Sequence, residues 1–417
     1  MKKTWLALLV AVLSIPAAGG IPAGAEPAAP APTISVDRAQ PGRGIPDVYV
    51  VSVKQGANID DVLSQAKIKE TRVKSAALRS FAAKLTKPQV EALQRNSSVE
   101  MILEDRVVTS TSSIEGYTPT DEPGPGWATD RINQAALPLD GSYTTNATGA
   151  GVTAYVIDGG IDVNHPDFEG RASEGTSLVD TAPTPNCGGY QHGTGVAGVL
   201  GGAKFGVAKK VKLVSVRTTG CDGGASLSTV LAAAAWVGAN HQKPAVVNVS
   251  FNINGTGSLE DIATATILRG VFNALSADLG LFIANSTSNR NLDACMGAPA
   301  DAAGVVAVAH TDIDDRAADS ADWGPCIQLY APGRNVPFPA IGSGFVKSSG
   351  SSFAAPMVAG VGALYKSAYG DAPSQTVTNW IKDKSTKDVV KPKLNPYPNP
   401  NVIPTPTVNR LLNTGGL

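Results

Sequence analysis

A repeated alternation of short apolar runs with alanine-rich stretches constrains the fold of this chain more than any other feature. Helical stretches at 228–239 and 262–277 separate several of these runs. The five runs are Val152–Ile157, Val211–Val216, Ala245–Val249, Leu281–Ala284 and Val305–Ala309. Strands that alternate with helices form a parallel sheet covered on both faces, because every parallel connection must cross over the sheet. We therefore predict an α/β fold with a doubly wound, mostly parallel sheet, whose active residues lie at the carboxyl ends of strands.

A smaller unit of mixed pattern precedes this region. Val48–Val53 and Val99–Leu103 are predicted strands, whereas 58–66 and 87–95 have helical spacing. The pattern predicts an α+β unit at about 47–108, which is marginal in size for folding alone. The Pro/Ala-rich stretch 26–46 before it is interpreted as a flexible leader, and 109–126 after it as a linker.

The first 25 residues have the three parts of a secretory signal peptide. Lys2 and Lys3 precede the apolar run Trp5–Ile15, and Ala23-Gly24-Ala25 forms a cleavage site. No later stretch reaches the roughly 18 unbroken apolar residues of a membrane span. We therefore expect a secreted, extracellular protein with no membrane segment after signal removal. The net charge of −1 over 417 residues argues against nucleic-acid binding, which requires a basic surface.

Asp158 is the first residue with a candidate chemical role. It directly follows a predicted buried strand, and Gly159 and Gly160 come next. Burying a carboxylate costs free energy unless the group is paired or hydrogen-bonded. A catalytic carboxylate and a loop Asp that bonds its own backbone are both consistent with this position.

His192 is the strongest candidate for a general base among the four histidines. It precedes the small-residue segment GTGVAG at 193–198, which can approach another backbone closely. His165 lies in a turn-like run, His241 lies beside a surface loop, and His310 ends a strand without a nucleophile nearby in sequence.

Two adjacent serines, Ser351 and Ser352, begin a predicted helix of small and apolar residues. A serine in this position gains from helix-terminal N–H groups, which can also stabilise an oxyanion. An ordinary N-cap serine would have the same position. The position leaves open which of the two would act as a nucleophile.

The chain order Asp158, His192, Ser352 resembles that of the subtilase family, and most closely its proteinase K-like branch. The family motifs are D-T/S-G, H-G-T-H-V-A-G and G-T-S-M-A-x-P. This chain has DGG at 158–160, HGTGVAG at 192–198 and GSSFAAP at 350–356. The upstream α+β unit resembles the inhibitory propeptide of these enzymes. Together these features predict a signal peptide at 1–25, a propeptide at 26–115 and a subtilisin-like peptidase domain at 116–417.

The resemblance implies catalytic roles for single residues. The family serine follows G-T, so Ser352 is the expected nucleophile, with His192 as general base and Asp158 orienting the imidazole. Asn285 and Asn289 compete for the role of oxyanion donor. Alignment on Gly280 and on the APA run at 298–300 favours Asn289.

The resemblance also implies a substrate site. Extended peptides would pair with two backbone segments, which are Gly224-Ala225-Ser226 and Ser250-Phe251-Asn252. Thr287 and Ser288 stand where relatives have smaller residues, and two family glycines near Ser250 are absent. We therefore predict a narrower or more polar primary pocket.

Four cysteines in an exported chain predict disulfides, and the sequence alone allows three pairings. A metal site is disfavoured because no C-x-x-C pattern is present. The resemblance implies the pairs Cys187–Cys221 and Cys295–Cys326. No cofactor is expected. One calcium site of proteinase K-like enzymes uses an Asp where this chain has Gln328, a poorer calcium ligand, so structural calcium has no support here.

The resulting expectation is a secreted serine endopeptidase, made as a zymogen that cuts itself between Ser110 and Glu122. Its expected partners are protein or peptide substrates and its own propeptide, and the enzyme is expected to be a monomer. The alternative is a catalytically impaired binding protein of the same fold, suggested by the family departures Gly159, Gly195, Ser351 and Phe353. None of them removes the nucleophile or a proton-transfer group. A lipase or esterase would have Ser before Asp and His in the chain, so the order here opposes that class.

Overall fold

The computed structural model describes residues 33–76, 78–109, 116–179, 191–221, 223–254, 258–394 and 406–417. The chain divides into two compact units, Met1–Thr33 and Ile34–Leu417, and every feature described below lies in the second. The predicted signal peptide at 1–25 therefore lies outside the described residues. Within the described ranges, no helix is long and apolar enough to cross a bilayer.

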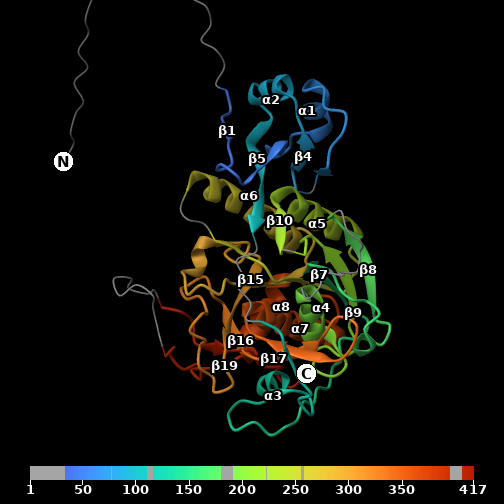
Figure 1. Ribbon diagram of the computed structural model, residues 1–417, viewed down its shortest axis with the longest axis vertical. Helices are drawn as coiled ribbons and strands as arrows, with labels where there is room; N and C mark the ends of the chain where they lie inside the picture. Colours follow the sequence, from blue (N-terminus) through green and yellow to red (C-terminus); the bar gives the residue numbers. More distant parts are fainter. Residues whose placement is uncertain are drawn as a thin grey trace, which may run out of the picture. The chain divides into compact units, whose positions relative to one another are not determined.

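A nine-stranded sheet forms the centre of the unit (Figure 1), in the order β19-β20-β16-β15-β13-β11-β7-β9-β8. Every neighbouring pair is parallel except β19 and β20. The strands are β7 (Thr153–Asp158), β8 (Ala172–Ser177), β9 (Lys212–Arg217), β11 (Ala245–Val249), β13 (Phe282–Ser286), β15 (Val305–Thr311), β16 (Leu329–Pro332), β19 (Thr386–Lys387) and β20 (Arg410–Leu411). The mostly parallel α/β sheet confirms the predicted fold class.

Helices cover both faces of this sheet, because successive residues of each strand point to opposite sides. In β7, Ala154 and Val156 belong to one core, whereas Tyr155 and Ile157 belong to the other. The first core is completed by α3 (Trp127–Asn133), α4 (His192–Gly201), α7 (Ser351–Tyr369) and α8 (Ser374–Lys384), and the second by α5 (Leu227–Asn240) and α6 (Leu259–Ala277). The continuous apolar runs in the sequence follow from this burial on both faces.

The carboxyl end of β7 lies at a topological switch point. From β7 the chain continues to β8 and β9 on one side of it, and only later enters β11 on the other side. Open α/β folds bind ligands outside the strand ends at such a point. Helix α7 begins near this edge, and all of its residues from Ser351 to Lys366 are buried.

Shorter elements complete the larger domain. They are β6 (Thr118–Pro119), β17 (Val336–Pro339) and β18 (Phe345–Ser348) in one small sheet, β12 (Ile253–Asn254) paired with β14 (Gly297–Ala298), the strand β10 (Gly224–Ser226), and the 3-10 turns at Pro166–Phe168 and Ala294–Met296.

The upstream α+β unit has the order two strands, helix, two strands, helix, strand. Its elements are β1 (Val36–Asp37), β2 (Gly44–Val53), α1 (Ile59–Gln65), β3 (Val73–Ser75), β4 (Ser80–Lys84), α2 (Lys87–Gln94) and β5 (Val99–Thr109). The sheet order β5-β2-β4-β3 makes it a ferredoxin-like split βαβ arrangement. Asn58 caps α1 through its side chain, and Thr86 with Gln89 forms a capping box at α2.

Three boundaries differ from the sequence prediction. The unit does not begin near Asp47, because β1 pairs with β5 and the Ile34 N–H donates to Gln94 O. The Pro/Ala-rich composition of 26–46 concealed this two-residue strand. Strand β5 continues past Leu103 to Thr109, and the predicted linker 109–126 contains β6, which pairs with β18.

Candidate active site

Asp158 ends β7 and lies almost completely buried beside His192. The Nδ1 atom of His192 lies 2.9 Å from Asp158 Oδ1 and 3.0 Å from Oδ2. The carboxylate also accepts the N–H of Gly159 at 2.6 Å. Both side chains are 3% exposed. The Asp158 carboxylate thus bonds both the backbone of its own loop and a histidine ring. The interpretation as a loop Asp accounts only for the first of these bonds.

His192 is the first residue of α4, whose start lies very close to the loop after β7. A Cβ on Gly193 would lie 2.3 Å from Gly160 O, so this contact requires glycine. The other histidines have different partners. His165 accepts the Asp167 N–H, His241 lies at the end of α5 with Nδ1 beside Gly238 O, and the buried His310 lies beside Ser320 Oγ.

The two serines at the start of α7 have different hydrogen bonds. Ser351 Oγ donates to Thr287 O at 2.6 Å and lies 3.0 Å from Asn289 Oδ1, so its hydroxyl is engaged. Ser352 Oγ makes a longer bond of 3.3 Å to Ser250 O. Phe353 follows Ser352, and its ring centroid lies 5.8 Å from that of His192. Ser352 is therefore the serine with the longer hydroxyl bond, and the ring of the residue after it lies near the histidine.

The two candidate asparagines differ in the state of their amide groups. Asn285 Nδ2 donates to Val249 O at 2.7 Å and to Phe251 O at 2.8 Å, so it is committed to backbone. Asn289 Oδ1 accepts the Ser351 N–H at 2.8 Å. Asn289 Nδ2 is buried and donates no hydrogen bond within the described part of the chain. A buried donor of this kind beside Ser351 and Ser352 can stabilise a developing oxyanion.

The predicted substrate segment Gly224-Ala225-Ser226 forms strand β10, and it pairs with the end of β5. The pairing is antiparallel, with Gly224 opposite Thr109, Ala225 opposite Val108 and Ser226 opposite Val107. Figure 1 shows β5 leaving the α+β unit and lying along β10. The upstream unit thus adds a strand to this edge in the way an extended peptide would.

Asp105 of β5 anchors the same strand to helix α5. Its Oδ1 accepts the Ser228 N–H at 3.0 Å, and its Oδ2 accepts the Ser228 hydroxyl at 2.6 Å. The residue has no exposed surface. Since α5 begins at Leu227, the carboxylate lies at the positive end of the helix, where a negative charge is favourable.

The second predicted substrate segment, Ser250-Phe251-Asn252, follows β11 and is buried. Ser250 is interlocked with Ser352, because its Oγ donates to Ser352 O at 2.9 Å while its own carbonyl accepts from Ser352 Oγ. Thr287 Oγ1 donates to Val308 O at 3.3 Å, and Ser288 Oγ donates to Asp322 at 2.9 Å. Both hydroxyls are occupied internally, so they give no support to the more polar pocket that we predicted from them.

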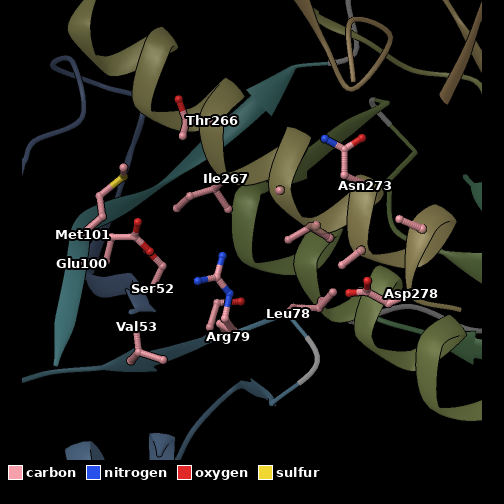
Figure 2. A pocket seen from close by; sticks show the side chains of 15 residues that line it. Ser52, Val53, Leu78, Arg79, Glu100, Met101, Thr266, Ile267, Asn273 and Asp278 are labelled. Carbon is pink, nitrogen blue, oxygen red and sulfur yellow. The ribbon is translucent and has the colours of Figure 1, made fainter. Parts of the chain in front are cut away.

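Figure 2 shows a cavity of about 390 Å³ between the α+β unit and α6. Ser52, Arg79 and Glu100 line it from the α+β unit, and Thr266 and Asn273 line it from α6. The contact between the two parts is therefore incompletely packed on this side. An ion pair, Arg43–Asp261 at 3.8 Å, connects the α+β unit to α6.

The structure contains a disulfide between Cys295 and Cys326. Cys221 is also disulfide-bonded, but Cys187 lies outside the described residues, so its pairing stays a prediction. Gln328 Nε2 donates to Val305 O at 2.7 Å. Its Oε1 is buried and accepts no hydrogen bond within the described residues. Among the described residues, no group of three or more His, Cys, Asp or Glu could hold a metal.

Two of the four departures from the family motifs, Gly195 and Phe353, pack against Phe338. The rings of Phe338 and Phe353 stack with centroids 4.6 Å apart. A Cβ on Gly195 would lie 2.6 Å from the Phe338 ring, so the glycine makes room for it.

A buried carboxylate–imidazole pair at the switch point of a parallel sheet is typical of a serine hydrolase. Comparison with known proteins narrows this class. The family model of the subtilase family matches residues 149–400. The extracellular serine proteinase of Thermus sp. (strain Rt41A) is 34% identical over 94% of this chain and 96% of its own length.

Two further similarities agree with this match. Alkaline serine exoprotease A of Vibrio alginolyticus is 36% identical over 75% of this chain, which spans 56% of that protein. A crystal structure of a cold adapted subtilisin-like serine proteinase has a TM-score of 0.60 and 32% identity, covering 70% of this chain and 99% of the other. The chain belongs to the subtilase family of serine peptidases.

Proposed function

We propose that the chain is a secreted endopeptidase of the proteinase K-like branch, made as a zymogen. Ser352 attacks the scissile carbonyl, and His192 takes its proton and then delivers it to the leaving amine. Asp158 holds the imidazole in the correct orientation and stabilises its charged form. The observation that carries this assignment is the bond between His192 Nδ1 and Asp158 at 2.9 Å. It is supported by Asn289 Nδ2, which is buried and has no partner within the described residues.

Asn289 acts in this proposal as the side-chain oxyanion donor. Ser351 bonds its side-chain carbonyl oxygen, so the Nδ2 end of the amide is the end that remains available. An amide donor engaged only by the developing oxyanion contributes to kcat and not to ground-state binding. Replacing Asn289 by Ala should therefore lower kcat by about 10²–10³-fold with little change in KM.

The α+β unit acts as the propeptide and inhibitor. Its tail already pairs with β10, the edge proposed to bind substrate, which supports occupation of the cleft by the propeptide. Tyr117 packs on Phe338 with ring centroids 6.1 Å apart, and β6 is paired with β18. Residues from Tyr117 onward are thus part of the peptidase domain. We place the maturation bond between Thr109 and Tyr117, which narrows the predicted interval of Ser110 to Glu122.

The test compares secreted wild type with Ser352→Ala by intact mass and N-terminal sequencing. Wild type should appear without the signal and α+β unit, with a new N-terminus between residues 110 and 117. Ser352→Ala should accumulate uncut and should not react with a fluorophosphonate probe. Normal maturation of Ser352→Ala would show that another protease performs the cut. Failure of the mature wild-type protein to react with the probe would favour the catalytically impaired binding protein instead.

A further inference from the structure

The loop that carries Asn289 is joined along its length to the segment 320–326. Three backbone hydrogen bonds connect them, from Asn291 N–H to Ser320 O at 3.0 Å, from Trp323 N–H to Leu292 O at 3.0 Å, and from Ala294 N–H to Trp323 O at 2.8 Å. The disulfide Cys295–Cys326 closes the far end. The loop is therefore held by a second segment that lies outside all three motifs.

A buried carboxylate, Asp322, lies at the end of this junction nearest to Asn289. Its Oδ2 accepts the Ser288 N–H at 2.6 Å, and its Oδ1 accepts the Ser288 hydroxyl at 2.9 Å and the Leu292 N–H at 3.0 Å. Asp322 has no exposed surface. One carboxylate thus brackets the loop from the residue before Asn289 to the third residue after it.

Such a group is costly to bury. Burial raises the pKa of Asp322, while the hydrogen bonds from Leu292 and Ser288 and the charge of Lys393 oppose this. Among the described residues Lys393 forms no salt bridge with Asp322, and its Nζ donates to Asn291 Oδ1 at 2.6 Å and to Ala321 O. A buried carboxylate that lacks a direct ion pair usually costs stability. Its three loop bonds point to a role in holding the loop.

We propose that Asp322 is a positioning residue for the Asn289 amide. The inference rests on the proposed function of Asn289. Asp322 sets the backbone on either side of Asn289, and Ser351 holds the amide oxygen, so Nδ2 has one available direction. Loosening the first anchor would let the donor drift from the oxyanion, and displacements near 1 Å are enough to reduce catalysis strongly.

The test uses Asp322→Asn in the full chain, matured as the wild type is. Asn keeps the size of the side chain but exchanges one acceptor oxygen for a donor, so it cannot satisfy all three loop groups. We expect kcat to fall by about tenfold or more, with KM within about twofold, because only transition-state stabilisation is affected. Asp315→Asn is the matched control, since Asp315 is also a buried aspartate but pairs with Arg131. It should leave kcat unchanged.

A double-mutant cycle separates positioning from general damage to the fold. In an Asn289→Ala background, Asp322→Asn should cause no further loss of kcat, because the group that it positions is already absent. The inference is overturned if Asp322→Asn has wild-type kcat, or if it lowers kcat by the same factor in both backgrounds. Full activity of Asn289→Ala would instead contradict the oxyanion assignment itself.

If Asp322→Asn does not mature, a milder variant tests the inference instead. Ser288→Ala removes one of the three bonds to the carboxylate and keeps the two backbone donors. It should lower kcat by about two- to fivefold with unchanged KM, and this loss should also vanish in the Asn289→Ala background. Wild-type kcat in Ser288→Ala would count against the inference.

Discussion

The interior of the peptidase domain and its contact with the α+β unit are packed in different ways. In the interior, Asp158 and His192 are 3% exposed, and the cores on both faces of the sheet are continuous. At the contact with the α+β unit, Val50, Leu103 and Val108 join the second core, but cavities of about 390 and 140 Å³ lie beside α6. Hollows of about 570 and 400 Å³ also lie in the peptidase domain, along β7–β9 and between α6 and α8. Polar connections between the two parts include the β5–β10 pairing, Asp105 and an ion pair at 3.8 Å.

This difference explains how one chain can contain a permanent part, the peptidase domain, and a removable part, the α+β unit. Cavities and partly exposed ion pairs contribute little stability, because they leave atoms without neighbours and charges in water. The strand pairing with β10 supplies affinity through backbone groups, and any extended substrate can replace it. A contact of this kind can inhibit and can still be released after cleavage.

The largest expected effect contrasts equivalent truncations in the two regions. Phe282 is fully buried against α7, and Phe282→Ala should lower the free energy of unfolding by about 3–5 kcal/mol. Leu78 lines both cavities, and Leu78→Ala should leave the unfolding of the peptidase domain unchanged. Guanidinium denaturation in the uncut Ser352→Ala background measures both. Equal destabilisation of the peptidase domain would remove the distinction between the regions.

Substitution of Asp105 tests the buried hydrogen bonds that join the α+β unit to α5. Asp105→Ala leaves the Ser228 N–H and hydroxyl without their buried acceptor, which should cost about 1.5–3 kcal/mol of binding. The separated α+β unit should then inhibit the mature enzyme about 10- to 100-fold more weakly, as measured by its inhibition constant. Asp61→Ala, an exposed residue of α1, is the control. Unchanged inhibition by the Asp105 variant would place the affinity in the strand pairing alone.

Substitution of His310 tests how the stability of the peptidase domain depends on pH. Burial, with Lys393 and Arg334 nearby, lowers the pKa of His310 to about 3. The unfolded chain binds this proton below about pH 6.5, so stability is present above that pH and is lost as pH falls toward 3. His310→Asn should therefore reduce the loss of unfolding free energy between pH 7.5 and 4.5 by about 2 kcal/mol. An unchanged pH slope would exclude His310 as its source.

The smallest expected effect concerns calcium. The Gln328 amide donates to Val305 O, so we expect no calcium ion at this position. A chelator should therefore not lower the melting temperature of the mature enzyme by removing calcium from it. Gln328→Asp should be less stable than wild type in a chelator, and added calcium should restore part of that loss. This account would be contradicted if a chelator lowers the melting temperature of the wild type but does not lower that of the Gln328→Asp variant.

Local patterns predicted the elements well. The run Ala245–Val249 is β11 without any change of boundary, and the two predicted helices of the α+β unit are α1 and α2. Such elements follow from periodicity and capping, which are properties of neighbouring residues. Strand β1 was missed because two residues in a Pro/Ala-rich stretch have no periodicity, and only pairing with β5 makes them a strand.

The site was predictable to the extent that its residues lie in local motifs. Asp158, His192 and Ser352 each follow a strand or begin a helix among small residues, and their order in the chain indicated the family. Asp322 had no such signal beyond its place beside the Trp-Gly-Pro-Cys run at 323–326. Its partners lie 30–34 residues away, so no local pattern could reveal it.

The sequence alone was sufficient for the fold class, the family and the three residues of the proposed triad, because each depends on short-range spacing and chain order. Residue type alone left Asn285 and Asn289 both open, and only the family resemblance favoured Asn289. Tertiary contacts separate them, because backbone carbonyls occupy the amide of Asn285 and Ser351 holds the oxygen of Asn289. Hydrogen-bond partners distant in the chain determine which polar group remains available, and that depends on folding in three dimensions.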